Sequence, residues 1–263
     1  MEEKIIKIAL CHLVLSQGPE RENRRLLLQA MEQAAQAGAD WIITPEGALQ
    51  GYYFKRQQPD YPVKVQDEEA LSEFTALARK LGVYLFLGCG EHDAQQNLDF
   101  NSCLVINPAG KIQSRHRKVT DIKGLTEGWA APAPGVQVTE CQGIRVGVLV
   151  CADAWYDDRP RSLQEQGAQV IIDIAAWPPS EICGNPFGKW QQVSQNTGLP
   201  FVLCNQTGTT EWMDMYIGES VVNYQGKCLL TYQGDPGILL FSWDFQHNQL
   251  LGSNYEILPT PAL

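Results

Sequence analysis

The order in which strands and helices alternate constrains this chain most. At its start, the apolar segments IIKIALCHLVL, WIITPEG and VYLFLGCGEH predict strands, separated by two segments in which apolar residues recur at helical spacing. The first expected helix, RRLLLQAMEQAAQAG, ends at Gly38, and the second, EEALSEFTALARKLG, ends at Gly82. This part of the chain therefore predicts strands that are connected by crossover helices.

Further along the chain, hairpins replace the crossovers. Expected strands flank an Asn-Pro-Ala-Gly turn at 107–110, Gln142-Gly143 and Gln225-Gly226. A short helix around RSLQEQG, a strand in QVIIDIAAW, a helix in FGKWQQVSQNTG and strands in FVLCNQTG and GILLFSW complete the pattern, with ILPTPAL as an extended tail. Since a purely parallel sheet would lack hairpins, we expect an α/β fold of two mixed sheets packed face to face with helices outside. No change in composition marks a linker, so we predict one domain over residues 1–263.

Composition narrows the classes of partner. The 263 residues are 44% hydrophobic and 19% charged, which is enough apolar material for a large core. The formal net charge is −10 and no block of Lys and Arg stands out, which argues against nucleic acid or an anionic membrane as a partner. No apolar run has the length of a transmembrane helix, and the N-terminal segment lacks the pattern of a signal peptide. We therefore expect a cytoplasmic protein with no membrane partner.

The cysteines and histidines do not predict a metal site. The eight cysteines form no CxxC pair, and the four histidines have no metal-ligand spacing. Without a secretory signal, reduced thiols are a better interpretation than a disulfide framework.

Three reactive side chains each lie where an expected strand ends. Glu46 follows WIITP, Lys118 follows IQSRHR, and Cys151 follows VGVLV. Residues at strand ends can converge on one crevice although they are far apart in sequence. Together these residues could carry out nucleophilic catalysis, because a carboxylate can take the proton of a thiol and an ammonium can stabilise an oxyanion. Taken singly, Cys151 could equally be a small core residue, and Lys118 a solvated one.

A second constellation pairs Cys151 with a histidine. His116 is the histidine nearest to Cys151 in sequence, and it would share a face with Lys118 if that strand is regular. A Cys-His thiol hydrolase therefore stays open at this point.

Three segments carry a resemblance to a known family. TPEGALQGYYF, RHRKVTDIKGLTEGWAAPAPG and VGVLVCADAWYDD resemble the signature segments of the nitrilase superfamily of carbon–nitrogen hydrolases, in the family's order. The similarity extends over nearly the whole chain, and it implies a four-layer αββα sandwich of two mixed sheets with outer helices. It also implies a Glu-Lys-Cys triad, here Glu46, Lys118 and Cys151.

The resemblance implies roles for these residues. Cys151 would attack an amide carbon to give a thioester, and Glu46 would act as the general base. Lys118 would stabilise the oxyanion with the main-chain N–H of Ala152. Glu127 would orient Lys118 or contact the substrate; its alternative is an ordinary loop carboxylate beside Gly128. No cofactor is implied, and a homodimer or higher homo-oligomer is expected.

Aromatic residues near the triad predict the substrate pocket. Tyr52, Trp129, Trp155 and Trp177 follow or precede the expected catalytic positions, and together they would form a tight pocket for a small or flat acyl group, unless they only pack in the core. Two acidic residues near them, Asp153 and Asp173, could bind a cationic substrate tail or satisfy main-chain groups at strand ends.

The segment after Cys151 bears on the substrate. CADAWYDDRPR lacks the Cys-Tyr-Asp of many amidases and the Cys-Trp-Glu of nitrilases, and its Cys-x-Asp-x-Trp is similar to the glutaminase domains of NAD synthetases. The resemblance thus favours an amidase that releases ammonia and a carboxylate from a small ω-amide or carbamoyl compound. The alternatives are a nitrilase, an acyltransferase, or a non-catalytic binding protein on the same fold.

Overall fold

Two mixed sheets form the centre of the protein. The computed structural model describes residues 4–124, 126–181 and 184–260. The seven-stranded sheet has the order β13-β12-β1-β2-β3-β4-β5, with bounds Ile5–His12 (β1), Trp41–Ile43 (β2), Tyr84–Asp93 (β3), Leu98–Ile106 (β4), Ile112–Arg117 (β5), Gly237–Asp244 (β12) and Gln249–Pro259 (β13). The six-stranded sheet has the order β11-β10-β9-β8-β7-β6, with bounds Val138–Cys141 (β6), Ile144–Val150 (β7), Val170–Ala175 (β8), Phe201–Asn205 (β9), Ser220–Tyr224 (β10) and Lys227–Tyr232 (β11).

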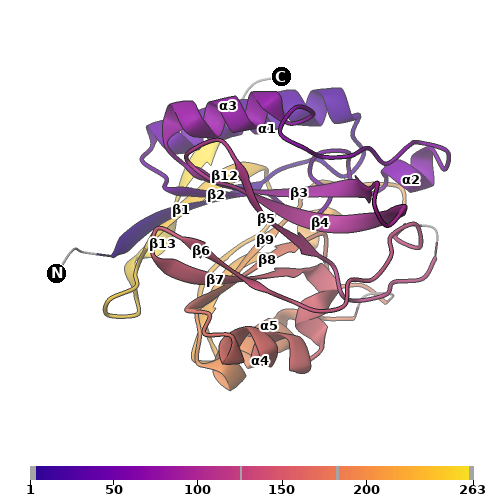
Figure 1. Ribbon diagram of the computed structural model, residues 1–263. Helices are drawn as coiled ribbons and strands as arrows, with labels where there is room; N and C mark the ends of the chain where they lie inside the picture. The colour runs from indigo at the N-terminus through magenta and orange to yellow at the C-terminus, as the bar shows by residue number, and fades with distance from the viewer. Residues whose placement is uncertain (1–3, 125, 182–183, 261–263) are drawn as a thin grey trace.

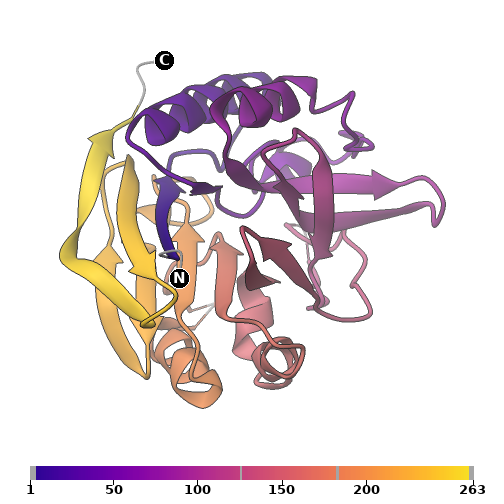
Figure 2. The same cartoon turned by 60° about the vertical axis from the view of Figure 1, so that its left-hand side comes forward.

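Helices cover the outer face of each sheet, as Figures 1 and 2 show. The helices are α1 (Glu20–Gln36), α2 (Phe54–Gln57), α3 (Ser72–Leu81), α4 (Asp158–Glu165) and α5 (Phe187–Thr197), with 3-10 turns η1 (Cys151–Trp155) and η2 (Met215–Ile217). In Figure 1, α1 and α3 lie above the seven-stranded sheet, and α4 and α5 lie below the six-stranded one. The expected αββα sandwich is therefore confirmed.

The strand directions follow the pattern of crossovers and hairpins. β1, β2 and β3 are parallel neighbours, as are β7, β8 and β9. The expected hairpins β4–β5, β6–β7 and β10–β11 are antiparallel. Both sheets are mixed, as predicted, because helical crossovers force parallel pairing and short turns force antiparallel pairing.

The alternation of side chains along a strand divides the core between two layers. On β2, Trp41 and Ile43 join the hydrophobic cluster between the sheets, whereas Ile42 joins the cluster beneath α1 and α3. Every residue of β8 is buried. Strands that are covered on both faces consist mainly of apolar residues, which is why β2 and β8 could be recognised from sequence although they are short.

One expectation about the C-terminus is wrong. Residues 257–259 belong to β13, which pairs with β12 at the edge of the seven-stranded sheet, rather than to an extended tail. Most of β13 is exposed or half-buried, so it lacks the apolar run that marks the central strands. The last residues of the segment, 261–263, lie outside the described residues.

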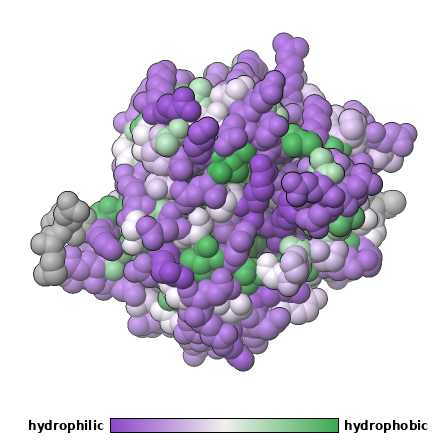
Figure 3. Space-filling view, viewed as in Figure 1, coloured by the Kyte–Doolittle hydropathy of each residue, from purple (hydrophilic) through white to green (hydrophobic). Residues whose placement is uncertain are grey.

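One face of the molecule shows how its apolar side chains are distributed. On the face seen in Figure 3, hydrophobic side chains form small separate patches among hydrophilic ones. Among the described residues, no helix has both the length and the apolar character needed to cross a membrane.

Candidate active site

The ends of three strands bring the predicted reactive residues together. Glu46 lies in the turn after β2, Lys118 directly follows β5, and Cys151 directly follows β7. The Lys118 Nζ donates to Glu46 Oε1 at 2.7 Å and to Glu127 Oε2 at 2.6 Å. The thiol of Cys151 hydrogen-bonds to the Glu46 carboxylate. One ammonium and two carboxylates thus form a connected group beside the thiol.

A tight main-chain contact positions Glu46. A Cβ on Gly88 of β3 would lie 2.0 Å from the carbonyl oxygen of Pro45, the residue before Glu46. Only glycine permits this approach, because any side chain would collide with main-chain atoms. The Thr44 hydroxyl reinforces the contact by accepting from the Gly88 N–H at 2.9 Å.

Asn101 completes the group, and we did not predict it from sequence. Its side-chain Nδ2 donates to Glu46 Oε1 at 2.8 Å and to Glu127 Oε2 at 3.1 Å. Its main-chain carbonyl accepts from the main-chain N–H of Lys118 at 2.8 Å. The signal that could have found it is the polar pair Asn101-Ser102 inside the apolar strand β4, since buried polar side chains need partners.

Each carboxylate has a further donor. Glu46 Oε2 accepts from the main-chain N–H of Ala176 at 3.0 Å, and Glu127 Oε1 accepts from the Tyr52 hydroxyl at 2.6 Å. These bonds fix both oxygens of each carboxylate, and so they fix the direction in which Lys118 and Cys151 are held.

Burial and charge determine the protonation behaviour of the group. Glu46 is fully buried, and Lys118 and Glu127 are 3% and 5% exposed. Burial raises the pKa of Glu46, although Lys118 opposes this change. Burial alone would lower the pKa of Lys118, but the carboxylates of Glu127 and Glu46 hold it well above its usual value. Lys118 therefore stays an ammonium, and Glu46 becomes a stronger base than an exposed carboxylate.

The thiol of Cys151 is protonated at rest. Burial, followed by the nearby Glu46 carboxylate, raises the pKa of Cys151 well above its usual value. Lys118 opposes this change without reversing it. Any nucleophilic chemistry here needs a base that removes the proton during attack, and the Glu46 carboxylate already accepts a hydrogen bond from this thiol.

A cavity of about 590 Å³ opens onto the thiol. It is lined by Tyr52, Tyr53, Arg56, Thr120, Ile122, Lys123, Thr126, Glu127, Cys151, Ala152, Trp155, Tyr156, Ala176, Trp177, Glu181, Gly184, Trp212 and Met213. Glu46 and Lys118 do not line it, but they contact Cys151 and Glu127, which do. The size suits a small molecule, and six of these lining residues are aromatic.

Of the aromatic residues expected in the pocket, three line the cavity. Tyr52, Trp155 and Trp177 do so, with the Trp155 and Trp177 rings 5.7 Å apart. Trp129 does not line it, which corrects the expectation of substrate contact. Its indole donates to the Thr126 carbonyl at 2.9 Å and its ring packs on Phe54. The main chain turns after Glu127 and directs this ring away from the cavity.

The two aspartates of uncertain role bind main-chain groups. Asp153 Oδ1 accepts from the N–H groups of Val119 and Thr120, at 3.1 and 2.7 Å, and so ties the turn after Cys151 to the segment after Lys118. Asp173 Oδ1 accepts from the Cys151 N–H at 2.6 Å. Both are buried and neither lines the cavity, so of the two expectations the contact with main-chain groups is the correct one.

His116 lies apart from this group. It is 3% exposed, its Nε2 contacts the Ser114 hydroxyl at 2.9 Å, and it does not line the cavity. Burial lowers the pKa of His116 to about 4, so the ring is neutral at pH 7. We expect His116→Ala to retain turnover within about twofold while lowering the melting temperature, as is usual for truncation of a buried side chain. A folded His116→Ala protein that has lost all turnover would instead favour the Cys-His alternative.

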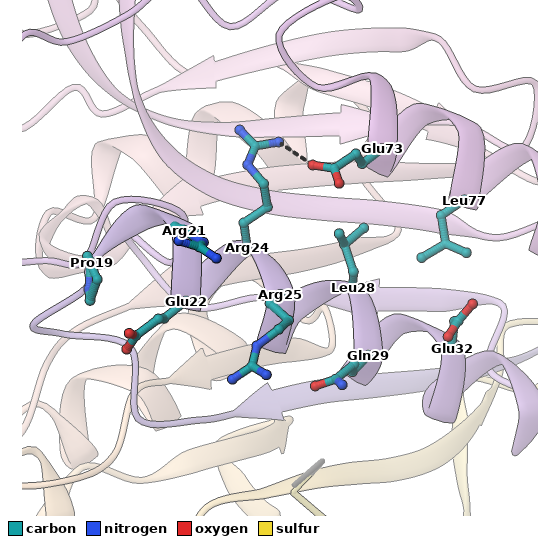
Figure 4. Close-up of a pocket in the computed structure, with 10 residues that line it drawn as sticks. All are labelled: Pro19, Arg21, Glu22, Arg24, Arg25, Leu28, Gln29, Glu32, Glu73 and Leu77. Carbon is teal, nitrogen blue, oxygen red and sulfur yellow. Dashed lines mark ion pairs between the residues drawn. The ribbon is translucent and has the colours of Figure 1, made fainter. Parts of the chain in front are cut away.

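A second hollow, on the outer face of α1, differs in character (Figure 4). Its charged side chains include Arg24 and Glu73, which pair with each other at 3.5 Å. None of the described cysteines or histidines lines it. Across 4–124, 126–181 and 184–260, no group of three His, Cys, Asp or Glu side chains could hold a metal ion. The chemistry-bearing side chains thus gather at the cavity beside Cys151.

Comparison with known proteins identifies the family. The sequence profile of the family described as carbon-nitrogen hydrolase matches residues 7–232. The chain therefore belongs to the carbon–nitrogen hydrolase family, and the resemblance to the nitrilase superfamily is confirmed.

Individual relatives agree with this assignment. The chain is 28% identical to a citrullinase of Francisella tularensis over 93% of this chain and 91% of that protein. It is 26% identical to a glutamine-dependent NAD(+) synthetase of Synechocystis over 96% of this chain, but it spans only about half, 49%, of that relative's length. An amidase from Nesterenkonia sp. AN1 has the same fold, with a TM-score of 0.78 at 21% identity, covering 89% of this chain and 92% of that one.

Proposed function

We propose that this protein is a cysteine-dependent amidase that hydrolyses a small ω-amide or carbamoyl compound through a thioester on Cys151. One observation carries the proposal: a thiol that lines a cavity is hydrogen-bonded to a buried carboxylate, which is paired with a buried ammonium. A protein that only binds ligands has no use for this arrangement, because burying three charged groups is unfavourable. The Nesterenkonia relative is described with acrylamide added at its active-site cysteine.

In the first half of the reaction, the Cys151 sulfur attacks the amide carbon and the thiol proton passes to Glu46. The raised pKa of Glu46 suits this step, since a base is most effective when its pKa is near the working pH. The tetrahedral intermediate then collapses, the C–N bond breaks, and Glu46 returns the proton to the leaving nitrogen. Ammonia leaves and the acyl group stays on sulfur.

In the second half, a water molecule attacks the thioester with Glu46 again as the base. The C–S bond breaks, the sulfur regains its proton, and the carboxylate is released. Lys118 has three N–H donors, of which Glu46 and Glu127 take two. The third, with the N–H of Ala152, would stabilise the oxyanion in both halves. Glu127 and Asn101 hold Lys118 in place for this.

The cavity supports a substrate that carries a charge away from its amide. Arg56 lies on the wall with its guanidinium 4.8 Å from the centre of the Trp212 ring. It has no ion-pair partner among the residues that the structure describes, and a stacked, unpaired guanidinium is well suited to a carboxylate. We propose that Arg56 receives a carboxylate of the substrate, as in the monoamide of a dicarboxylic acid.

Two relatives point to related substrates. Their names, citrullinase and glutamine-dependent NAD(+) synthetase, refer to compounds with a terminal carbamoyl or amide group at one end and a carboxylate at the other. The predicted homodimer and the predicted cytoplasmic location remain predictions.

A substrate series tests the proposal. We expect ammonia release from glutarate monoamide, and about tenfold lower kcat/KM for pentanamide, which has the same length but no carboxylate. Arg56→Gln should lower kcat/KM for the monoamide about tenfold, mainly through KM, and leave pentanamide unchanged. The matched control is Arg79→Gln, a helix-surface arginine that donates to the Ala109 carbonyl.

The outcomes separate the two parts of the proposal. No ammonia from any amide or carbamoyl compound would contradict the amidase. Ammonia from pentanamide and glutarate monoamide at equal kcat/KM would leave the amidase intact but contradict the role of Arg56. Preference for 5-aminopentanamide would assign the charge recognition to Glu181, the acidic residue of the cavity wall that does not take part in the buried group.

A further inference from the structure

Cys151 has a main-chain conformation that needs an explanation. Its φ is +53°, in the left-handed region that side chains other than glycine rarely adopt. The other described non-glycine residues with positive φ all lie in hairpin turns, where this conformation is common; they are Asn97, Gln142, Gln225 and Asn248. Cys151 instead follows a buried central strand, so a different interaction must hold it there.

The pairing of the parallel strands ends immediately before Cys151. Val150 on β7 is opposite Ile174 on β8, and this is the last pair of the ladder. The N–H of Cys151 points to the Asp173 side chain instead, with 2.6 Å between N and Oδ1. A side-chain oxygen thus replaces the main-chain acceptor at the point where the nucleophile leaves the sheet.

The surroundings of Asp173 do not suit a negative charge. Its side chain is fully buried, and its Oδ2 has no hydrogen-bond partner among the described residues. The ionisable groups that act on it are Cys151 and Asp153 of η1, Glu46 after β2, Lys118 after β5, and Cys103 of β4. The one cation, Lys118, already pairs with Glu46 and Glu127. An ionised Asp173 would have no cation of its own and would also oppose removal of the thiol proton.

We propose that Asp173 is a positioning residue, which holds the main chain of Cys151 in its left-handed conformation and does so as a neutral carboxylic acid. The oxygen that accepts from Cys151 fixes the direction of the thiol towards Glu46 and the cavity. Burial raises the pKa of Asp173 well above its usual value, in agreement with this geometry. The inference rests on the proposed role of Cys151 as the nucleophile.

Two substitutions separate the oxygen from the charge. Asp173→Leu removes the acceptor, and we expect it to lower kcat about 100-fold with little change in KM. Asp173→Asn keeps an acceptor oxygen at the same place but can never ionise. We expect it to recover most of the loss, to within about fivefold of the wild type, with the midpoint of the pH–rate profile unchanged.

The reactivity of the thiol gives a readout that does not depend on turnover. The measurement is the rate at which iodoacetamide alkylates Cys151, monitored by peptide mapping from pH 6 to 10. This rate should fall about tenfold in Asp173→Leu and change little in Asp173→Asn. Asp40→Leu is the matched control, because Asp40 also accepts a main-chain N–H, that of Lys7 at 2.8 Å, but does not line the cavity. It should lower the melting temperature and leave kcat and alkylation unchanged.

The contrary outcomes are distinct. An Asp173→Leu protein with kcat and alkylation rate near those of the wild type would overturn the positioning role. A lower midpoint in Asp173→Asn, for either the pH–rate profile or the alkylation profile, would show that Asp173 carries a charge and would overturn the neutral acid. If Asp173→Leu does not fold, the Asn variant still decides the second point, and Asp173→Ser, whose shorter side chain weakens the bond, tests the first through alkylation. Alkylation also separates a failure here from a failure of the proposed function, since it needs no substrate.

Discussion

Replacing Lys118 by methionine is expected to abolish turnover and to lower the free energy of unfolding by about 3–5 kcal/mol. Lys118 is 3% exposed and is the shared donor to Glu46 and Glu127, at 2.7 and 2.6 Å. Methionine has nearly the same length and keeps the packing of the chain, but it leaves two buried carboxylates facing each other without a cation. The loss of stability therefore reports on charge rather than on volume.

The pH dependence of this loss has a definite sign. Without Lys118, one of the two carboxylates has its pKa raised in the folded state, because a proton shared between them relieves their repulsion. A carboxyl group whose pKa is raised in the folded state stabilises the fold at low pH. This stabilisation is lost as the pH rises through the folded-state pKa. Urea unfolding should thus show a smaller difference from the wild type at pH 5 than at pH 8.

Two further variants are controls for the effect of Lys118→Met on stability and turnover. Lys80→Met removes an exposed lysine, 3.6 Å from Glu32, and should change stability by less than about 0.5 kcal/mol and turnover not at all. Adding Glu127→Gln to Lys118→Met should restore part of the stability but none of the turnover. A Lys118→Met protein as stable as the wild type at pH 8 would contradict the buried charge network.

Replacing Cys151 by alanine is expected to lower turnover by about 10⁴-fold or more while leaving the fold intact. The variant loses the sulfur that would attack the substrate, and among the residues that the structure describes no other cysteine or histidine lines the cavity. Only one buried sulfur is removed, so unfolding free energy should change by about 1 kcal/mol or less. Ammonia release at saturating substrate measures the first effect and urea unfolding the second.

Cys228→Ala is the control for Cys151. Cys228 is an exposed thiol on β11 with no place in the cavity, and its removal should leave turnover unchanged. Substantial ammonia release by folded Cys151→Ala would mean that another group, or a directly activated water, attacks the amide.

Local sequence patterns predicted the two mixed sheets with outer helices, and the resemblance to the family implied the triad. β2 and β8 are covered on both faces, so their residues are apolar except for Asp173 of β8, and the ends of both strands are easy to recognise. Glu46 and Cys151 follow apolar segments, whereas Lys118 follows the polar strand β5. Spacing did not show that the three residues meet; the resemblance to the family implied it. The hairpins were recognisable from their turn residues, because those turns require particular main-chain conformations.

Contacts that depend on register or on the path of a loop could not be predicted. Asn101 reaches Glu46 and Glu127 only because β4 pairs with β3 in one particular register. The sequence around Asn101 does not determine that register. Trp129 is close to Glu127 in sequence but is turned towards Phe54 by the loop between them. β13 is exposed over most of its length, so edge pairing rather than hydrophobicity determines it.

The most direct test is to look for the acyl group on sulfur. Cys228→Ala protein, which lacks the exposed thiol, would be mixed with glutarate monoamide, quenched in acid within the first turnovers, and weighed intact and after proteolysis. We predict an added mass equal to the acyl group, located on the peptide that contains Cys151 and missing when Cys151→Ala is also present. Steady ammonia release with no acyl group on Cys151 at any quench time, or an acyl group on another residue, would contradict catalysis through a Cys151 thioester.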